Sequence, residues 1–220
     1  MTARVDVILP CRDEAAALPG VLAGLPDADG YRTLVVDNGS TDGTAEVAAQ
    51  HGAAVVREDQ PGYGAAVHTG LLHSTAEVVC FADADGSMRL QHLPDLVRRL
   101  LDEPADLVVG RRVPVVPGAF PWHARLGNAA VAGMLRRRGL AVRDLAPMRV
   151  GRRRQLLDLG IADRGFGYPL ELLVRAGRAG WHIEEVPVDY HPRASGTRSK
   201  VTGSVRGTAR AVRDMARVLR

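Results

Sequence analysis

The chain has few cysteines, a single lysine, few aromatic side chains and no long hydrophobic run. Only Cys11 and Cys80 are present among 220 residues, which argues against a disulfide framework and fits a reducing compartment. No apolar stretch approaches the roughly 18 residues that a membrane-spanning helix needs, and the N-terminus lacks a signal-peptide pattern. Aromatic residues make up 4% of the chain, which leaves few platforms for nucleic-acid bases. We therefore expect a cytoplasmic protein without a nucleic-acid partner.

Arginine supplies nearly all of the positive charge. Lysine and arginine together number 29 against 25 acidic residues, and Lys200 is the only lysine. Guanidinium groups bind phosphate through pairs of parallel hydrogen bonds. This charge alone therefore suits nucleotide, lipid-phosphate or nucleic-acid partners equally, and only the low aromatic content argues against the last. Hydrophobic residues make up 46% of the chain, so a globular core is expected.

Apolar runs and helical stretches alternate along the first half of the chain. This order predicts an α/β fold with a Rossmann-like, mostly parallel sheet flanked by helices. The strands expected there are residues 5–10, 33–37, 53–57, 78–82 and 106–110. In the second half we expect an edge strand over residues 183–190 and a loop over 191–203. The helices expected there are residues 123–139, 152–159, 169–179 and 204–220.

Two aspartates one residue apart follow the apolar run Val78–Ala82. Open α/β sheets bind ligands at the carboxyl ends of their strands, so Asp83 and Asp85 mark a candidate site. Two carboxylates this close repel each other unless a cation or a proton lies between them. Oxygen ligands on a short loop suit Mg²⁺ or Mn²⁺ that also holds a diphosphate. An acidic turn without a ligand is the alternative interpretation.

Three strand-end motifs together resemble the family 2 glycosyltransferases of the GT-A fold. They are Pro10-Cys-Arg-Asp-Glu14, Val35-Val-Asp-Asn-Gly-Ser-Thr-Asp-Gly-Thr44 and Phe81-Ala-Asp-Ala-Asp85. The second is similar to that family's V-D-D/N-G-S-x-D-G-T pattern, and the third to its Asp-x-Asp metal motif. The resemblance covers residues 4 to 112. It implies a metal-dependent, inverting hexosyltransferase that uses a GDP-, UDP- or dTDP-sugar.

The second half resembles the dolichyl-phosphate mannosyltransferase branch and its bacterial polyprenyl-phosphate relatives. The residues that carry this resemblance are Gly110-Arg-Arg112, Arg125, residues 144–149 and residues 193–200. The last segment has one residue more than the branch's Arg-x-x-Gly-x-Ser-Lys loop. The resemblance implies a polyprenyl phosphate acceptor, a role in glycan or cell-wall biosynthesis, and contact with the inner face of a membrane. A small soluble hydroxyl acceptor stays open as an alternative.

The same resemblance implies three groups of site residues. The substrate-binding group is Pro10, Arg12, Glu14, Asp37, Asn38, Ala84, Ser199 and Lys200. The metal-binding group is Asp83, Asp85 and Ser87, holding Mg²⁺ or Mn²⁺. The catalytic group is Asp83, Asp85, Arg112, Arg125 and Arg193, in which the arginines hold an acceptor phosphate. A phosphate acceptor is already anionic, whereas a hydroxyl acceptor needs a base such as Asp144 or Glu171.

We expect one domain over residues 1–220, with three parts. Residues 1–112 form the nucleotide-sugar half, 113–203 the acceptor half, and 204–220 a basic amphipathic helix. Arginines recur every three or four residues on one face of that helix, and apolar residues occupy the other. Such a helix either lies on an anionic membrane or packs its apolar stripe on the domain.

Three other functions compete with this interpretation. The strand followed by Asp83-Ala-Asp85 also resembles the nucleophile motif of haloacid-dehalogenase-type phosphatases, although that motif normally opens its domain and three strands precede it here. Gly62-Tyr-Gly64 is a weak match to a dinucleotide-binding turn. A non-catalytic nucleotide-sugar-binding module is the third, and the retained aspartate pair argues against it.

Overall fold

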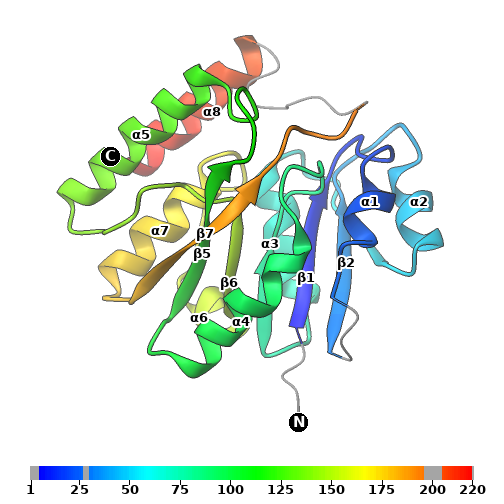
Figure 1. Ribbon diagram of the computed structural model, residues 1–220, viewed down its shortest axis with the longest axis horizontal. Coiled ribbons are helices and arrows are strands. Elements are labelled where there is room, and N and C mark those ends of the chain that lie inside the picture. Colours follow the sequence, from blue (N-terminus) through cyan, green and yellow to red (C-terminus); the bar gives the residue numbers. More distant parts are fainter. Residues whose placement is uncertain (1–4, 27–29, 196–204, 220) are drawn as a thin grey trace.

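A seven-stranded sheet lies between two layers of helices in the computed structural model, which describes residues 5–26, 30–195 and 205–219 (Figure 1). The elements are β1 (Val5–Cys11), α1 (Leu18–Leu22), β2 (Tyr31–Asp37), α2 (Thr44–Gln50), β3 (Ala54–Arg57), α3 (Tyr63–His73), β4 (Val78–Phe81), the 3₁₀ turn η1 (Leu90–His92), α4 (Leu93–Asp102), β5 (Leu107–Pro114), α5 (Trp122–Arg137), β6 (Met148–Arg152), α6 (Arg153–Asp158), α7 (Tyr168–Arg178), β7 (Ile183–Tyr190) and α8 (Val205–Leu219).

The strands are ordered β3-β2-β1-β4-β6-β5-β7, and only β6 runs antiparallel to its neighbours. This confirms the predicted α/β fold with a mostly parallel sheet. The edge strand expected over residues 183–190 is also confirmed, because β7 stands last in the strand order, next to β5. No strand was predicted at β6, which inserts between β4 and β5.

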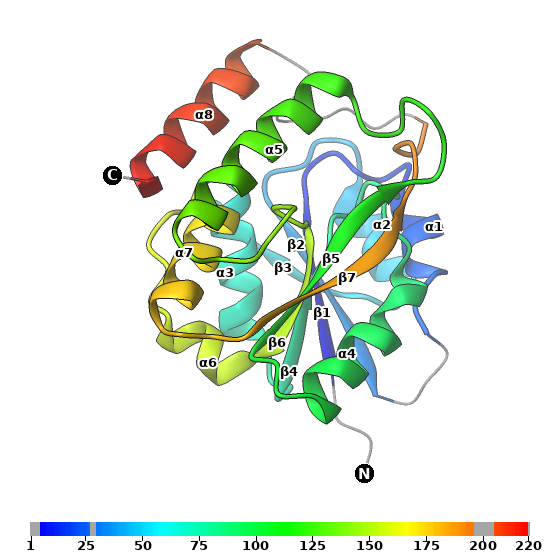
Figure 2. The ribbon, with the colours of Figure 1, turned by 60° about the vertical axis from the view of Figure 1, so that its left-hand side comes forward.

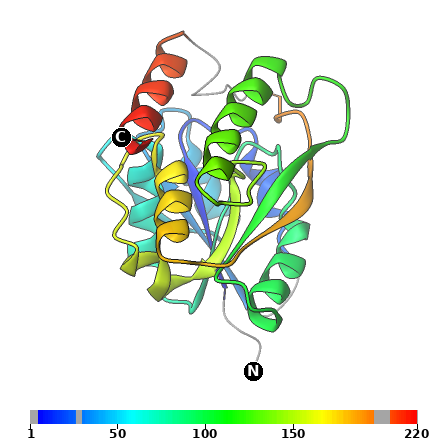
Figure 3. The same ribbon diagram turned by 90° about the vertical axis from the view of Figure 1, so that its left-hand side faces the viewer.

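Each face of the sheet carries its own hydrophobic core. Side chains from α1, α2 and α4 pack with alternate residues of the strands on one face. Those from α3, α5, α6, α7 and α8 cover the other face, as the turned views show (Figures 2 and 3). The strand β1 is buried along nearly its whole length, as expected for a central strand covered on both faces.

Helix α4 shows how the sequence produces this layering. Its buried residues Leu93, Leu96, Val97 and Leu100 recur at intervals of three and four, so they form one face of the helix. Pro94 lies in the first turn, where its missing N–H costs no hydrogen bond. Burying each leucine side chain contributes about 1.5 to 3 kcal/mol.

Helix α3 lies close to its neighbours because glycines face them. A Cβ on Gly70 would lie 2.3 Å from the Cγ2 atom of Ile8 in β1. A Cβ on Gly64 would lie 2.7 Å from the Cβ atom of Tyr168 in α7. The amide of Gly64 also donates to the carbonyl oxygen of Gly165 at 3.0 Å. These contacts fix the start of α3 against the segment before α7.

The sheet has a switch point between β1 and β4. From β1 the chain continues to β2 and β3 on one side, whereas β4 pairs with β1 on the other. Open α/β sheets bind ligands in the crevice outside the carboxyl ends of such strands. In Figure 1 the carboxyl end of β1 points upward. Among the described helices, none combines the length and apolar character needed to cross a membrane.

Candidate functional site

The aspartate pair lies at the switch point, directly after β4. The strand ends at Phe81, which pairs with Ile8 of β1 and with Arg149 of β6. Asp83 is half-buried, whereas Asp85 is only 3% exposed. The two carboxylates therefore lie at the carboxyl edge of the sheet, where the sequence predicted a site.

Asp85 is held from two sides. One carboxylate oxygen, Oδ1, accepts a hydrogen bond from the Ser87 amide at 2.9 Å. The other, Oδ2, lies 2.5 Å from the Nη1 atom of Arg193. A backbone hydrogen bond joins the same two segments, because the Ala194 amide donates to the Asp85 carbonyl oxygen at 2.9 Å. The loop that follows β7 thus brings Arg193 onto the aspartate pair, 108 positions away in the chain.

Asp83 lacks such support. No described residue donates a hydrogen bond to its carboxylate. Burial raises the pKa of Asp83, and the neighbouring Asp85 raises it further, while Arg193, Arg112 and Arg149 lower it. The net direction is upward, so the surrounding arginines do not fully compensate the two negative charges. A cation placed between the carboxylates would supply the missing compensation.

The donor atoms here fit a magnesium or manganese ion. They are the carboxylate oxygens of Asp83 and Asp85 and the hydroxyl of Ser87, which is buried and has no hydrogen-bond partner among the described residues. Hard divalent ions prefer such oxygen ligands. No three His, Cys, Asp or Glu side chains gather into a metal site in the described ranges. A protein with so few ligands leaves coordination positions for phosphate oxygens.

The first two strand ends carry the predicted nucleoside residues. Pro10 lies within β1, followed by exposed Arg12 and buried Glu14, whose amide donates to the Thr44 hydroxyl at 2.9 Å. Ala84, between the aspartates, is buried in the hydrophobic core. These residues and the aspartate pair therefore lie along one edge of the sheet, consistent with a shared binding site.

Asp37 and Asn38 at the end of β2 have different local roles. The Asn38 carboxamide donates to the carbonyl oxygens of Glu58 and Gln60 at 2.9 and 2.8 Å and accepts from the Gly62 amide at 2.8 Å. Its side chain thus secures the loop between β3 and α3. Among the described residues, only the Ser40 amide donates to the Asp37 carboxylate, at 3.1 Å. Asp37 is therefore the better placed of the two to contact a ligand.

Arg112 is bound to the protein by its guanidinium. Its Nε and Nη2 atoms donate to the two carboxylate oxygens of Asp144 at 3.0 and 2.6 Å. The rings of Phe120 and Tyr190 lie 4.2 and 5.5 Å from its Cζ atom. Burial alone would raise the pKa of Asp144, but Arg112 lowers it below its ordinary value. Arg112 therefore forms a buried ion pair beside the site.

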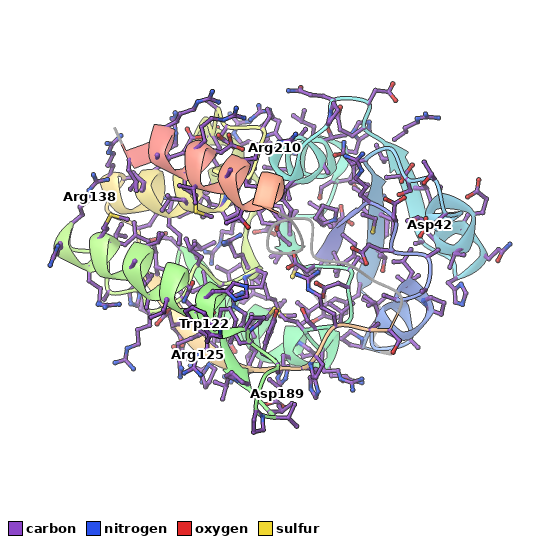
Figure 4. All side chains as sticks on the ribbon, turned by 90° about the horizontal axis from the view of Figure 1, so that it is seen from above. Asp42, Trp122, Arg125, Arg138, Asp189 and Arg210 are labelled. Atoms are coloured by element: carbon purple, nitrogen blue, oxygen red, sulfur yellow. The ribbon has the colours of Figure 1, made fainter. Side chains whose placement is uncertain are left out.

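Arg125 and Arg193 differ in exposure. Arg125 lies in the first turn of α5, and its side chain is exposed to solvent (Figure 4). Arg193 is 34% exposed and contacts Asp85. Ser199 and Lys200 lie outside the described residues. Of the three predicted phosphate-binding arginines, Arg193 is thus the one in contact with the aspartate pair.

Sequence reasoning gave no role to Arg149, which is buried beneath the site in β6. Its guanidinium donates to the carbonyl oxygen of Leu145. Burial lowers the pKa of Arg149, although nearby Tyr63 and Asp83 favour its charged form. The signal was present in the sequence as an arginine inside a short apolar segment, where a solvated charge is not expected.

Glu171, the other candidate base, is engaged in structural contacts. Both of its carboxylate oxygens accept from the Ala162 amide at 3.1 Å, and one accepts from the Asp163 amide at 2.6 Å. The Arg175 guanidinium lies 2.6 Å away. Burial would raise the pKa of Glu171, but these donors lower it overall. This carboxylate secures the segment before α7.

Comparisons with known sequences give consistent matches. The sequence profile described as glycosyl transferase family 2 matches residues 6–160. An uncharacterized glycosyltransferase of Mycobacterium tuberculosis is 56% identical over 216 residues, which is 98% of this chain and 97% of that protein. The undecaprenyl-phosphate mannosyltransferase of Micrococcus luteus is 32% identical, over 94% of this chain and 90% of its own length.

Solved structures share the fold across the whole chain. Glucosyl-3-phosphoglycerate synthase from Mycobacterium tuberculosis, in complex with Mn²⁺, UDP and glucosyl-3-phosphoglycerate, superposes with a TM-score of 0.77. It is 25% identical, and the match covers 99% of this chain and 79% of that one. Mannosyl-3-phosphoglycerate synthase from Rubrobacter xylanophilus gives a TM-score of 0.79 at 23% identity, with coverage of 99% and 72%.

Proposed function

Because the chain belongs to glycosyl transferase family 2 and is a glycosyltransferase of the GT-A type, we propose that it transfers a sugar from a nucleotide diphosphate sugar to a polyprenyl phosphate. The reaction is a direct displacement with inversion at the anomeric carbon. An oxygen of the acceptor phosphate forms the new bond to that carbon, the bond to the donor diphosphate breaks, and the nucleoside diphosphate leaves with the electron pair.

One observation supports a phosphate acceptor above all. Both carboxylates that the sequence offered as bases for a hydroxyl acceptor, Asp144 and Glu171, are held in ion pairs and have lowered pKa values. A carboxylate with a lowered pKa is a weak base, and one bound by arginine is poorly placed to accept a proton. A phosphate acceptor needs no base, because it is already an anion at neutral pH.

The other supports come from charge and from the relatives. Arg193 extends from the loop after β7 to the aspartate pair, so a cationic group lies next to the proposed diphosphate position. An undecaprenyl-phosphate mannosyltransferase and a dolichyl-phosphate hexose transferase are among the relatives. Their names point to lipid-linked phosphate acceptors. We therefore favour Arg193 as the group that orients an acceptor phosphate.

The proposed ligands of the divalent cation are Asp83, Asp85 and Ser87. A Mg²⁺ or Mn²⁺ ion bound there would neutralise the charge that grows on the leaving diphosphate. Asp83 and Asp85 would hold the donor diphosphate at the switch point. Asp37 lies along the same edge of the sheet, where the nucleoside would bind. The buried Arg149 lowers the electrostatic cost of keeping Asp83 ionised.

A small soluble acceptor is the second candidate. It is favoured by the glucosyl-3-phosphoglycerate synthase complex, whose product carries the sugar on phosphoglycerate. A hydroxyl acceptor of this kind would have to lose a proton, and its phosphate would serve for recognition. The two candidates therefore differ in whether a proton must be removed and share a need for cationic groups near the donor.

The test is a transfer assay with matched acceptors. Purified protein with Mn²⁺ is incubated with GDP-mannose, UDP-glucose and a dTDP-sugar, and each donor is offered short-chain polyprenyl phosphate or 3-phosphoglycerate. We expect sugar transfer to the polyprenyl phosphate. Arg193→Ala should raise the KM for this acceptor far more than the KM for the donor, with Arg98→Ala as an exposed control. Transfer to 3-phosphoglycerate alone would favour the second candidate, and equal loss for both substrates would remove Arg193 from the acceptor site.

A further inference from the structure

Helices α5 and α8 lie side by side on one side of the molecule, as three views agree (Figures 2, 3 and 4). The Nη2 atom of Arg138, directly after α5, donates to the carbonyl oxygen of Leu219 at the end of α8 at 3.0 Å. We call the exposed residues of these two helices, together with Arg138, the α5–α8 face. Its exposed members are Trp122, Arg125, Leu126, Arg136, Arg137, Arg138, Arg210, Val212, Arg213 and Arg217.

The charge of this face has one sign. Helix α5 contains no acidic residue, and the only acidic residue of α8 is Asp214, which is buried. Asp214 faces inward and accepts a hydrogen bond from the Phe166 amide at 3.3 Å. It also lies 3.5 and 3.8 Å from Arg213 and Arg217. The remaining arginines of the face form no ion pair with any described residue, so they present uncompensated positive charge.

Large apolar side chains stand among these arginines. Trp122 is 73% exposed, and Leu126 and Val212 are each 62% exposed. Trp122, Leu126, Ala129 and Gly133 follow the helical spacing of three and four, so they line one outward stripe of α5. Tryptophan is favoured at the boundary between lipid headgroups and hydrocarbon, because its ring is apolar and its N–H is polar.

The apolar stripe of α8 itself is already used by the fold. Ala211 is buried, and Met215, Val218 and Leu219 pack against the core beneath. The structure therefore supports the domain-packing interpretation of this helix for its apolar face. Its described arginine side chains, Arg210, Arg213 and Arg217, remain exposed to solvent. The two helices together, and not α8 alone, form an amphipathic surface.

We propose that the α5–α8 face docks the enzyme on an anionic lipid surface. Clustered arginines are attracted to anionic headgroups, and Trp122 and Leu126 can insert their apolar atoms at the headgroup level. A second copy of the chain is disfavoured as the occupant, because symmetric pairing would bring arginines against arginines. A nucleic acid is disfavoured because Trp122 is the only aromatic side chain on the face.

This inference rests on the proposed function and explains how a lipid-borne acceptor reaches the site. Helix α5 joins the face to the site through Asn128, whose Oδ1 atom accepts from the Arg112 Nη2 atom at 3.3 Å and from the Leu145 amide at 3.0 Å. An acceptor phosphate carried at a bilayer surface would meet the protein at this side. Docking would confine the enzyme's diffusional search for the acceptor to the plane of the membrane.

The experiment measures vesicle binding by co-sedimentation. Vesicles of phosphatidylglycerol and phosphatidylcholine in equal parts are compared with pure phosphatidylcholine. We expect binding to the anionic vesicles that weakens as salt rises, and a loss of about tenfold or more in Arg136→Glu/Arg137→Glu. The control Arg98→Glu/Arg154→Glu changes net charge equally at exposed sites on α4 and α6 and should bind like the unmodified protein. Trp122→Ser provides a second variant without a charge change.

Each outcome decides between the two proposals. Equal binding of both vesicle types, or equal loss in the control variant, would overturn the docking surface. Tighter binding to a DNA fragment than to the anionic vesicles would overturn it as well. Transfer to short-chain polyprenyl phosphate without vesicle binding would leave the function standing and the surface wrong. Vesicle binding without transfer to any acceptor would leave the surface standing and the function wrong.

Discussion

The contact between Arg193 and Asp85 makes an unusual prediction for metal binding. The guanidinium lies 2.5 Å from the Oδ2 atom of Asp85, so a divalent cation must share or displace it. Removing the guanidinium should therefore tighten the binding of Mn²⁺ to the protein alone. Charge-assisted hydrogen bonds contribute about 1.5 to 3 kcal/mol, and exposed ion pairs about 0.2 to 1. Arg193 is 34% exposed and Asp85 is buried, so we use an intermediate value of about 1.5 kcal/mol, or about tenfold in affinity.

The assay is a titration of Mn²⁺ into Arg193→Ala by electron paramagnetic resonance, without a donor sugar. Arg98→Ala serves as the control, because it removes an exposed arginine on α4 whose ion-pair partner is Asp95 of the same helix. The same Arg193→Ala variant should use the acceptor poorly, so metal binding and turnover should move in opposite directions. Unchanged or weaker Mn²⁺ binding in Arg193→Ala would refute the competition between arginine and cation.

Three further predictions follow from the geometry. Asp85→Ala should keep the thermal unfolding temperature near that of the unmodified protein but abolish turnover, and full activity of the unmodified enzyme in EDTA would contradict the proposed metal role. Burial would raise the pKa of Asp6, but Arg32 and three other donors lower it from 3.8 to about 2. Its stabilising contribution of about 2 kcal/mol is therefore present above pH 4 and lost as the pH falls towards 2, so Asp6→Asn should be destabilising near pH 7 and nearly neutral near pH 2 by urea unfolding. Gly64→Ala places a Cβ 2.7 Å from that of Tyr168 and should cost about 1 to 3 kcal/mol of unfolding free energy; an unchanged urea midpoint would show that α3 has room to shift.

The sheet was predictable where its strands are purely apolar. The runs that became β1, β2, β4 and β5 are nearly continuous hydrophobic segments bounded by turn residues, so periodicity located them. Strand β6 was missed because Arg149, Gly151 and Arg152 interrupt its apolar pattern. Arg149 is tolerated there because the Leu145 carbonyl oxygen accepts from its guanidinium and nearby Tyr63 and Asp83 favour its charged form, an environment that only the folded chain assembles.

The site was predictable in position and less so in its contacts. The aspartate pair follows the strand Val78–Phe81 and lies at the carboxyl edge of the sheet, as the geometry of parallel strands predicted. The pairing of Arg112 with Asp144 was not readable, because it depends on the path of the chain between β5 and β6. The contact of Arg193 with Asp85 likewise joins distant segments. Such pairings follow from tertiary packing, and residue spacing along the chain does not encode them.

The position of β6 has a consequence for how this enzyme can be divided or recombined. Residues 1–112 supply β4 and most of β5, but the strand between them comes from residues 148–152. Expressed alone, the first half would leave two inner edges of its sheet without partners, and such edges invite aggregation. Exchanging the second half between relatives would replace a central strand together with the acceptor residues. Altered acceptor choice is therefore more accessible through substitutions in loops than through exchange of whole segments.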